Sequence, residues 1–164
     1  MSQDDYAPST SSYIPSEIRE KMGSWIHGCD SCQEVCPRNQ RKLKMNPPVS
    51  PFLKHIASQF DMRKVLLLTE DYYQTVLRPI VYNYIREKKY FQRNAAIAMG
   101  NSGDRSYVPD LAKALEDPEP LVRGYSAWAL GRLGGEEARA AIEKALQVET
   151  EESARVEMAA ALAN

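Results

Sequence analysis

The chain has 164 residues, 43% of them hydrophobic, and a formal net charge of −1 at pH 7, so it is long enough to bury a core without crosslinks. An odd count of three cysteines and a polar N-terminus without a basic or apolar run argue against a disulfide framework and a secretory signal. No stretch approaches the roughly 20 apolar residues of a membrane span. We therefore expect a cytoplasmic monomer that contacts no membrane.

Four segments are expected along the chain. Residues 1–13 are rich in Ser and Asp and are predicted to be disordered or extended. Residues 14–45 carry the cysteines and begin with "IPSEIREKMGSWIHG", whose apolar spacing predicts a helix that ends at Gly28. Residues 46–60 form a linker around "NPPVSP" with a short helix near Phe52 to Ala57. Residues 61–164 are expected to form a helical repeat domain.

Cys29, Cys32 and Cys36 follow the pattern C-x2-C-x3-C-P. A bacterial ferredoxin run is C-x2-C-x2-C-x3-C-P, in which the fourth cysteine ligates the other cluster. The three cysteines match the last three of that run, and the missing first position falls on Ile26. The spacing therefore predicts that Cys29 and Cys32 share one iron-sulfur cluster and that Cys36 reaches a second.

Two alternatives remain for the same cysteines. A zinc ion needs four ligands, and His27 or His55 could complete such a site. The cysteines could also be free thiols that bind no metal, although exposed thiols without a partner are a redox liability.

Two groups of basic residues are candidates for contact with nucleic acid. The first lies in a stretch from Val35 to Phe60 that has no Asp or Glu, and the second alternates with aromatic residues that could stack on bases. Both groups could equally be solvated surface. The candidates are Arg38, Arg41 and Lys42 in the first group and Arg86, Lys88, Lys89 and Arg93 in the second.

The second half of the chain repeats itself. Thr69 marks a helix start, that helix should stop near Arg78 before Pro79, and another should run through "IVYNYIREKKY". Beyond it, "FQRNAAIAMG" aligns with "LVRGYSAWALG", and "LAKAL" aligns with "IEKAL", each 31 residues further on. Each period is then a pair of helices joined by tight turns. This predicts an all-α fold, a HEAT-type α-solenoid of helical hairpins preceded by a small ferredoxin-like cysteine loop.

The segment "IPSEIREKMGSWIHGCDSCQEVCPRN" closely resembles the part of epoxyqueuosine reductases that carries their second cysteine motif. "FQRNAAIAMGNSGD" and "LVRGYSAWALGRLG" likewise resemble the HEAT-like repeats that close such proteins. The resemblance implies 4Fe-4S clusters that relay electrons to a cobalamin cofactor, which reduces an epoxide on a nucleoside of tRNA. It gives cluster-ligand roles to Cys29, Cys32 and Cys36 only.

The resemblance also implies that this chain holds no catalytic residue. The cobalamin pocket and the remaining cluster ligands would belong to an N-terminal catalytic domain, which is a partner in cis or in trans, and tRNA is the second expected partner. Two other functions stay open. The chain could be a freestanding HEAT-repeat interaction module with a vestigial metal loop, or part of a related iron-sulfur reductase that acts on a small molecule.

Overall fold

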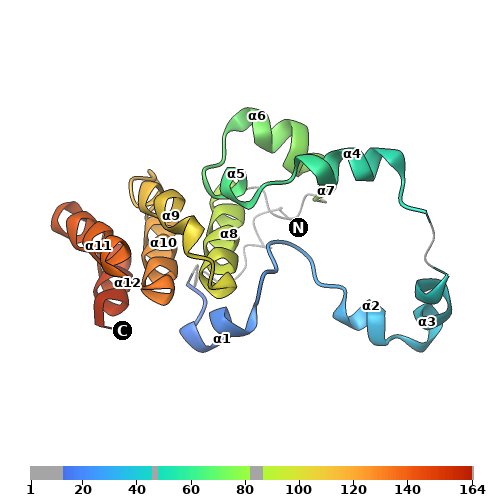
Figure 1. Cartoon of the computed structure of the whole chain (residues 1–164), viewed down its shortest axis with the longest axis horizontal. Coiled ribbons are helices and arrows are strands. Elements are labelled where there is room, and N and C mark those ends of the chain that lie inside the picture. The colour runs from blue at the N-terminus through green and yellow to red at the C-terminus, as the bar shows by residue number, and fades with distance from the viewer. Residues whose placement is uncertain (1–12, 46–47, 82–86, 164) are drawn as a thin grey trace, which may run out of the picture.

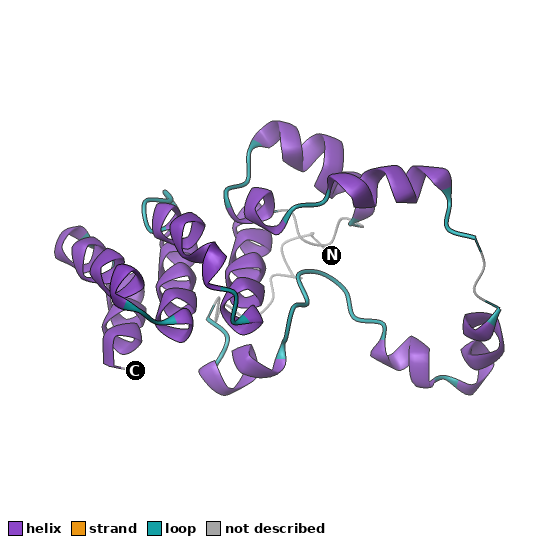
Figure 2. Ribbon diagram, in the orientation of Figure 1, coloured by secondary structure: helices purple, strands orange, loops and turns teal. Residues whose placement is uncertain are grey.

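The computed structural model describes residues 13–45, 48–81 and 87–163, and the regular elements within them are all helical (Figures 1 and 2). The N-terminal part holds α1 (Ser16–Lys21), α2 (Ser31–Val35), α3 (Pro37–Lys44) and α4 (Pro51–Gln59). The middle part holds α5 (Met62–Leu66), α6 (Glu70–Tyr72), a π-helical turn (Tyr73–Leu77) and α7 (Arg78–Ile80). The expectation for residues 1–13 lies outside the described residues, except at Tyr13, and so does the candidate Arg86.

The C-terminal part is the repeat domain. It holds α8 (Lys88–Ser102), a 3-10 turn (Arg105–Tyr107), α9 (Val108–Ala114), α10 (Pro120–Leu133), α11 (Glu136–Val148) and α12 (Glu152–Ala163). The pairs α9–α10 and α11–α12 are the predicted hairpins, and α10 packs between α8 and α12. Figure 1 shows these helices side by side in one row. The expected all-α solenoid is confirmed.

Two glycines let the second helices of the repeats approach closely. A Cβ atom on Gly100 of α8 would lie 2.9 Å from the Cα atom of Ala129 in α10. A Cβ atom on Gly131 of α10 would lie 2.9 Å from the carbonyl oxygen of Ala161 in α12. The 31-residue spacing between these glycines therefore reflects one repeated helix contact.

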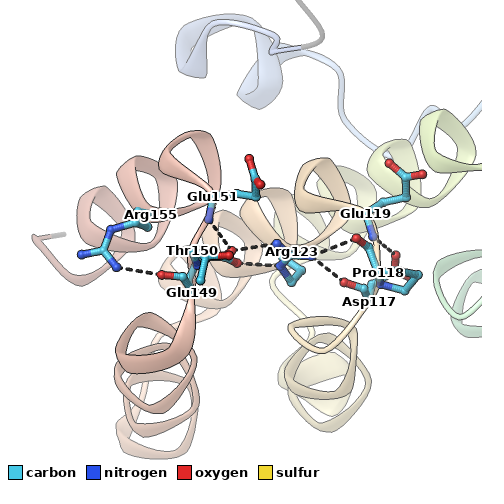
Figure 3. Close-up of polar contacts among 8 residues, drawn as sticks. All are labelled: Asp117, Pro118, Glu119, Arg123, Glu149, Thr150, Glu151 and Arg155. Carbon is cyan, nitrogen blue, oxygen red and sulfur yellow. Dashed lines mark hydrogen bonds and ion pairs between the residues drawn. The ribbon is translucent and has the colours of Figure 1, made fainter.

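The turns inside the hairpins α9–α10 and α11–α12 are held by a second repeated contact (Figure 3). Arg123 donates to Glu149 through Nε at 2.5 Å and Nη2 at 2.7 Å, and through Nη1 to the carbonyl oxygen of Asp117 at 2.8 Å. One repeat earlier, Gln92 donates to Asp117 at 2.8 Å. One repeat later, Arg155 donates to the carbonyl oxygen of Glu149 at 2.8 Å. A polar residue near the start of each second helix is thus hydrogen-bonded to a neighbouring turn.

Two helices end at other residues than the sequence predicts. The helix expected to end at Gly28 ends at Lys21, because Gly23 adopts a left-handed φ of 57°. The helix that begins after Thr69 does not stop before Pro79 but continues to Ile80, because the π-helical turn shifts the backbone hydrogen bonds ahead of the proline ring. Thr69 caps that helix as expected.

The helix expected through residues 80–90 is wrong at Val81 and Glu87, and its residues 82–86 lie outside the described part of the chain. Val81 and Glu87 both have extended backbone angles, and α8 begins only at Lys88. The short helix expected near Phe52 to Ala57 is present as α4. "GNSGD" ends α8 at the left-handed Gly103, and the Asp104 carboxylate then caps the following turn. No helix among the described residues is long and apolar enough to cross a membrane.

Two N-terminal segments are defined here by their packing. The strap, residues 13–27, lies against α8, α10 and α12. The arm, residues 28–55, leads away from the repeats through α2 and α3 to α4 and forms an open arc in Figure 1. No described residue of the arm is buried, and the chain returns to the core at Ile56, which is 6% exposed.

Candidate functional site

The cysteine loop, residues 28–45, begins where the strap ends and includes α2 and α3. Gly28 has a φ of 73°, which turns the backbone into Cys29 and Asp30, and Asp30 precedes the short helix α2 that carries Cys32. Cys36 is extended, with φ −69° and ψ 119°, between α2 and α3. This conformation is dictated by Pro37, which disfavours helical angles in the residue before it and is well placed at the first position of α3.

The α2–α3 hairpin is joined by side-chain hydrogen bonds on the surface. Asn39 donates to the amide oxygen of Gln33 at 2.5 Å, and Gln40 donates to the carbonyl oxygen of Glu34. All four of these residues lie within the cysteine loop segment, so the hairpin is held by local contacts and not by the repeats. The loop is therefore a small unit of its own in the first part of the arm.

The three thiols are accessible. Cys29 and Cys32 are exposed and Cys36 is half-buried, and none of them forms a disulfide. The sulfur of Cys29 lies 3.2 Å from the hydroxyl oxygen of Ser31. Hydrogen bonds from the Ser31 hydroxyl and then from its backbone N–H lower the pKa of the Cys29 thiol. Thiolate is the form that ligates metals, so this environment favours ligand chemistry at Cys29.

The donor type fits an iron-sulfur cluster, but the described residues do not complete a site. Within them no group of three or more His, Cys, Asp or Glu side chains comes together closely enough to hold a metal ion. His27 lies against Phe91, with ring centroids 5.5 Å apart, and His55 contacts Gln59 at 2.8 Å. Neither of these histidines is placed in the cysteine loop as a fourth ligand.

The two basic groups differ in their surroundings. Arg38, Arg41 and Lys42 are exposed on α3, and within the described residues none of the three forms an ion pair. The stretch around them has no acidic residue from Val35 to Phe60. No ion pair among the described residues therefore offsets the positive charge of α3, which lies directly after Cys36.

On α8, in contrast, the basic side chains meet partners within the protein. Lys88 forms an ion pair with Glu70, and Lys89 lies 2.6 Å from Glu87 and 3.8 Å from Glu119. The hydrogen bond to Glu87 raises the pKa of Lys89. These contacts neutralise much of the charge that the sequence alone assigns to this surface.

Arg93 is a further basic residue of α8 and is partly buried. Its Nε donates to Asn94 at 3.0 Å, and its guanidinium lies 5.1 Å from the Tyr90 ring centroid. Burial lowers the pKa of Arg93. Arg93 is therefore part of the packing of α8 as well as a candidate for contact with nucleic acid.

Sequence reasoning did not single out the residues that connect the strap to the repeats. Arg19, Asn94 and Asn101 make these connections, with Glu157 as the partner of Arg19. The one signal in the sequence is that Asn94 and Asn101 are seven residues apart on α8, a spacing that places two side chains on one helix face.

Comparison with known proteins places this geometry in a family. The model of the family described as HEAT repeats matches residues 80–163. An epoxyqueuosine reductase from Bacillus anthracis is 36% identical over 150 residues, which cover 91% of this chain and 39% of that protein. A Geobacillus stearothermophilus protein, described as an uncharacterized protein in the gldA 3' region, is 36% identical over 151 residues, covering 91% of this chain and 68% of that one.

A solved structure shows the same likeness in three dimensions. The crystal structure of an epoxyqueuosine reductase with a tRNA-Tyr epoxyqueuosine-modified tRNA stem loop matches with a TM-score of 0.74 and 31% identity. The match covers 92% of this chain and 40% of that one. This chain thus spans about two fifths of the epoxyqueuosine reductases that it matches. It belongs to the HEAT-repeat family and is a relative of a C-terminal portion of the epoxyqueuosine reductases.

Proposed function

We propose that this chain supplies the second cysteine motif and the repeat scaffold of an iron-sulfur oxidoreductase in queuosine synthesis. The observation that carries the proposal is that three accessible thiols in a ferredoxin-like spacing occur in a chain that is 36% identical over 150 residues to an epoxyqueuosine reductase. The rest of the enzyme, which the relatives carry in the other three fifths of their length, would be a partner in cis or in trans.

In this proposal Cys29, Cys32 and Cys36 are ligands of 4Fe-4S clusters. Cys29 and Cys32 would serve one cluster and Cys36 the other, and further ligands would come from the rest of the enzyme. When bound, the clusters supply one-electron transfer, and a cobalamin held by the rest of the enzyme supplies the reduction of the epoxide. This chain contributes thiolates, a fixed position for them and a positively charged surface beside them.

The proposal includes contact with tRNA through the basic group on α3. Arg38, Arg41 and Lys42 are exposed and free of ion pairs within the described residues, so phosphate groups would not have to displace a carboxylate. The solved relative with a bound tRNA stem loop supports an RNA substrate. Lys88, Lys89, Arg93 and Arg86 stay a secondary candidate surface.

The test of the cluster assignment is the metal content of the complete enzyme. The protein is produced and purified without oxygen, its iron, zinc and sulfide contents are measured, and the reduced sample is examined by electron paramagnetic resonance. We expect iron and sulfide in equal amounts and a 4Fe-4S signal that is lost when Cys29, Cys32 and Cys36 are changed to Ser. Tightly bound zinc without iron would exclude the proposal and favour the zinc alternative.

A second measurement separates the tRNA substrate from the other two functions. Binding of tRNA to the chain is measured by fluorescence anisotropy at several salt concentrations. Phosphate contacts predict an affinity that falls steeply as salt rises. An iron-containing enzyme that does not bind tRNA even at low salt would favour a small-molecule reductase. A chain that binds neither iron nor tRNA would favour a freestanding interaction module.

A further inference from the structure

The repeats hold the backbone of the strap through two asparagine side chains of α8. Asn101 donates through Nδ2 to the carbonyl oxygens of Arg19 at 2.8 Å and Gly23 at 3.1 Å. Asn94 donates through Nδ2 to the carbonyl oxygen of Ile26 at 2.7 Å. The carbonyl oxygen of Arg19 also accepts from the Met22 N–H at 3.2 Å, whereas Gly23 and Ile26 lie beyond the end of α1 and their carbonyl groups receive a donor from α8. The two asparagines therefore fix the strap at three successive points.

The strap is also held at the opposite end of the repeat row. Arg19 of α1 donates to Glu157 of α12 through Nη1 at 2.7 Å and Nη2 at 2.5 Å, and its side chain is only 5% exposed. The same guanidinium donates through Nε to the carbonyl oxygen of Ile14 at 2.6 Å and lies 4.4 Å from the Tyr125 ring centroid. Tyr125 in turn accepts from the Ile14 N–H.

This arrangement costs free energy to break, because it buries a charge. A guanidinium removed from water is stable only when its donors are satisfied, and a bidentate carboxylate satisfies two of them at once. Burial alone would lower the pKa of Arg19, but the hydrogen bonds from Arg19 to Glu157 and the neighbouring Tyr125 raise it overall. Removing the Glu157 charge leaves Arg19 buried without its partner.

The last of these contacts lies next to the cysteine loop. The bonded carbonyl of Ile26 is only three residues before Cys29, and none of the described arm residues is buried between Gly28 and Ile56. The direction in which the loop leaves the repeats is thus set by the strap. The contact between Arg19 and Glu157 joins residues 138 positions apart, so the last repeat helix helps to place the first cysteine.

We propose that Asn94, Asn101 and Glu157 are positioning residues for the cysteine loop, which they place by clamping the strap onto the repeats. The clamp itself stands on the contacts above, whereas the cluster that the loop would present rests on the proposed function. The repeat domain then has a second role besides contact with a partner. It holds Cys29 and Cys32 at a fixed place from which other ligands can complete a cluster.

The test measures where Cys29 lies relative to the repeats in the full chain. Cys32→Ser and Cys36→Ser leave Cys29 for one spin label, and Lys144→Cys on the exposed face of α11 provides the second. Pulsed electron paramagnetic resonance then gives the distance distribution. We expect a narrow distribution in this background and a clearly broader one after Glu157→Gln or Asn94→Ala. Glu143→Gln, which breaks the exposed pair of Arg139 and Glu143, is the matched control and should leave it unchanged.

Hydrogen exchange provides a second readout on the same variants. Loss of a buried hydrogen bond predicts that amides in the strap exchange about tenfold faster or more, while those of α10 keep their protection. Unchanged distances together with unchanged exchange in the strap would overturn the proposal. If Glu157→Gln unfolds the repeats, Asn101→Ala decides the question, because it removes neutral hydrogen bonds only, whereas Asn94→Ala also removes the acceptor of the Arg93 Nε–H.

A spectroscopic readout connects the clamp to the proposed cluster. In the iron-loaded complete enzyme, Asn94→Ala should change the resonance line shape or the reduction potential of the cluster, and Glu143→Gln should not. An enzyme that binds no iron would refute the proposed function and leave the distance measurements to decide the clamp. If the enzyme binds iron but the variants change neither the label distances nor hydrogen exchange in the strap, only the proposal about the positioning residues is refuted.

Discussion

Arg123 and Glu149 form a bidentate ion pair that ties the start of α10 to the turn between α11 and α12 (Figure 3). Glu149 also accepts from the backbone N–H groups of Thr150 and Glu151, at 3.0 Å and 2.9 Å. These donors, with the Arg123 hydrogen bonds first among them, hold the pKa of Glu149 at about 2, well below its ordinary value of 4.5. The ionised carboxylate is therefore the form that stabilises the repeats.

The first prediction concerns the pH dependence of stability. The folded-state pKa of Glu149 is lower than that of the unfolded chain, so its contribution is present above about pH 4.5 and is lost as the pH falls toward 2. The difference corresponds to about 3 kcal/mol at neutral pH. We expect Glu149→Gln to destabilise the chain by up to that amount at pH 7 and progressively less toward pH 3. Urea unfolding followed by circular dichroism measures this difference.

Glu143→Gln is the control for that experiment, because Glu143 lies in an exposed pair on α11 and should contribute within about 0.5 kcal/mol at every pH. Equal stability of Glu149→Gln and the unchanged chain at pH 7 would contradict the prediction.

The second prediction concerns two glycines of α10 that differ in their surroundings. A methyl group at Gly131 would meet the carbonyl oxygen of Ala161 at 2.9 Å, so Gly131→Ala should force α10 and α12 apart and cost about 1–3 kcal/mol. A methyl group at Gly124 would meet its nearest neighbour, the Tyr13 hydroxyl, at 3.3 Å. Gly124→Ala should be close to neutral, because the better helix propensity of alanine offsets the tighter contact.

Thermal unfolding of both variants separates the two effects. The prediction fails if Gly131→Ala melts at the same temperature as Gly124→Ala. A lower melting temperature for Gly131→Ala alone would show that close helix approach, and not glycine content, explains the repeated spacing.

The repeats could be predicted from the sequence because their contacts recur. The 31-residue spacing of Gly100 and Gly131 appears in the sequence itself, and the structure shows that each glycine makes the same kind of helix contact. The break in the first helix could not be predicted. Periodic apolar residues continue to Ile26, but Gly23 turns left-handed, and its carbonyl group is bound by Asn101 from α8.

The charged surfaces show the same limit of sequence reasoning. In the sequence, Lys88 and Lys89 are as basic as Arg38 and Arg41. In the fold, however, Lys88 and Lys89 form ion pairs with Glu70 and Glu119, which are distant in sequence. Arg19 resembles any surface residue of an amphipathic helix, and its partner is 138 residues away. Contacts of this kind depend on tertiary packing, so no local sequence pattern predicts them.

The third prediction tests α3 against α8 as the surface that binds RNA. Changing Arg38, Arg41 and Lys42 together to Gln should weaken tRNA binding and reduce the salt dependence of the affinity, by about 0.7–0.9 in the log–log slope for each phosphate group that is no longer neutralised. Changing Lys88 and Lys89 to Gln should have a smaller effect, because these side chains already pair with carboxylates. Fluorescence anisotropy with labelled tRNA at several salt concentrations provides the slopes.

Arg139→Gln is the control for nonspecific loss of positive charge, since Arg139 lies on α11 in an exposed pair. A larger decrease in slope for the α8 variant than for the α3 variant would show that the arm is not the RNA surface.

The last prediction follows from the separation between the cysteine loop and the core. Cys29 and Cys32 are exposed, Cys36 is only half-buried, and the α2–α3 hairpin is joined by its own surface hydrogen bonds. Changing all three cysteines to Ser should therefore alter the unfolding free energy of the metal-free chain by no more than about 0.5 kcal/mol. The same change should abolish iron binding in the complete enzyme, because hydroxyl groups do not replace thiolates as cluster ligands. Calorimetry on the chain and iron analysis on the enzyme measure the two effects independently. A large loss of stability would mean that the thiols pack into the fold, and iron retained by the triple variant would mean that the cluster ligands lie elsewhere.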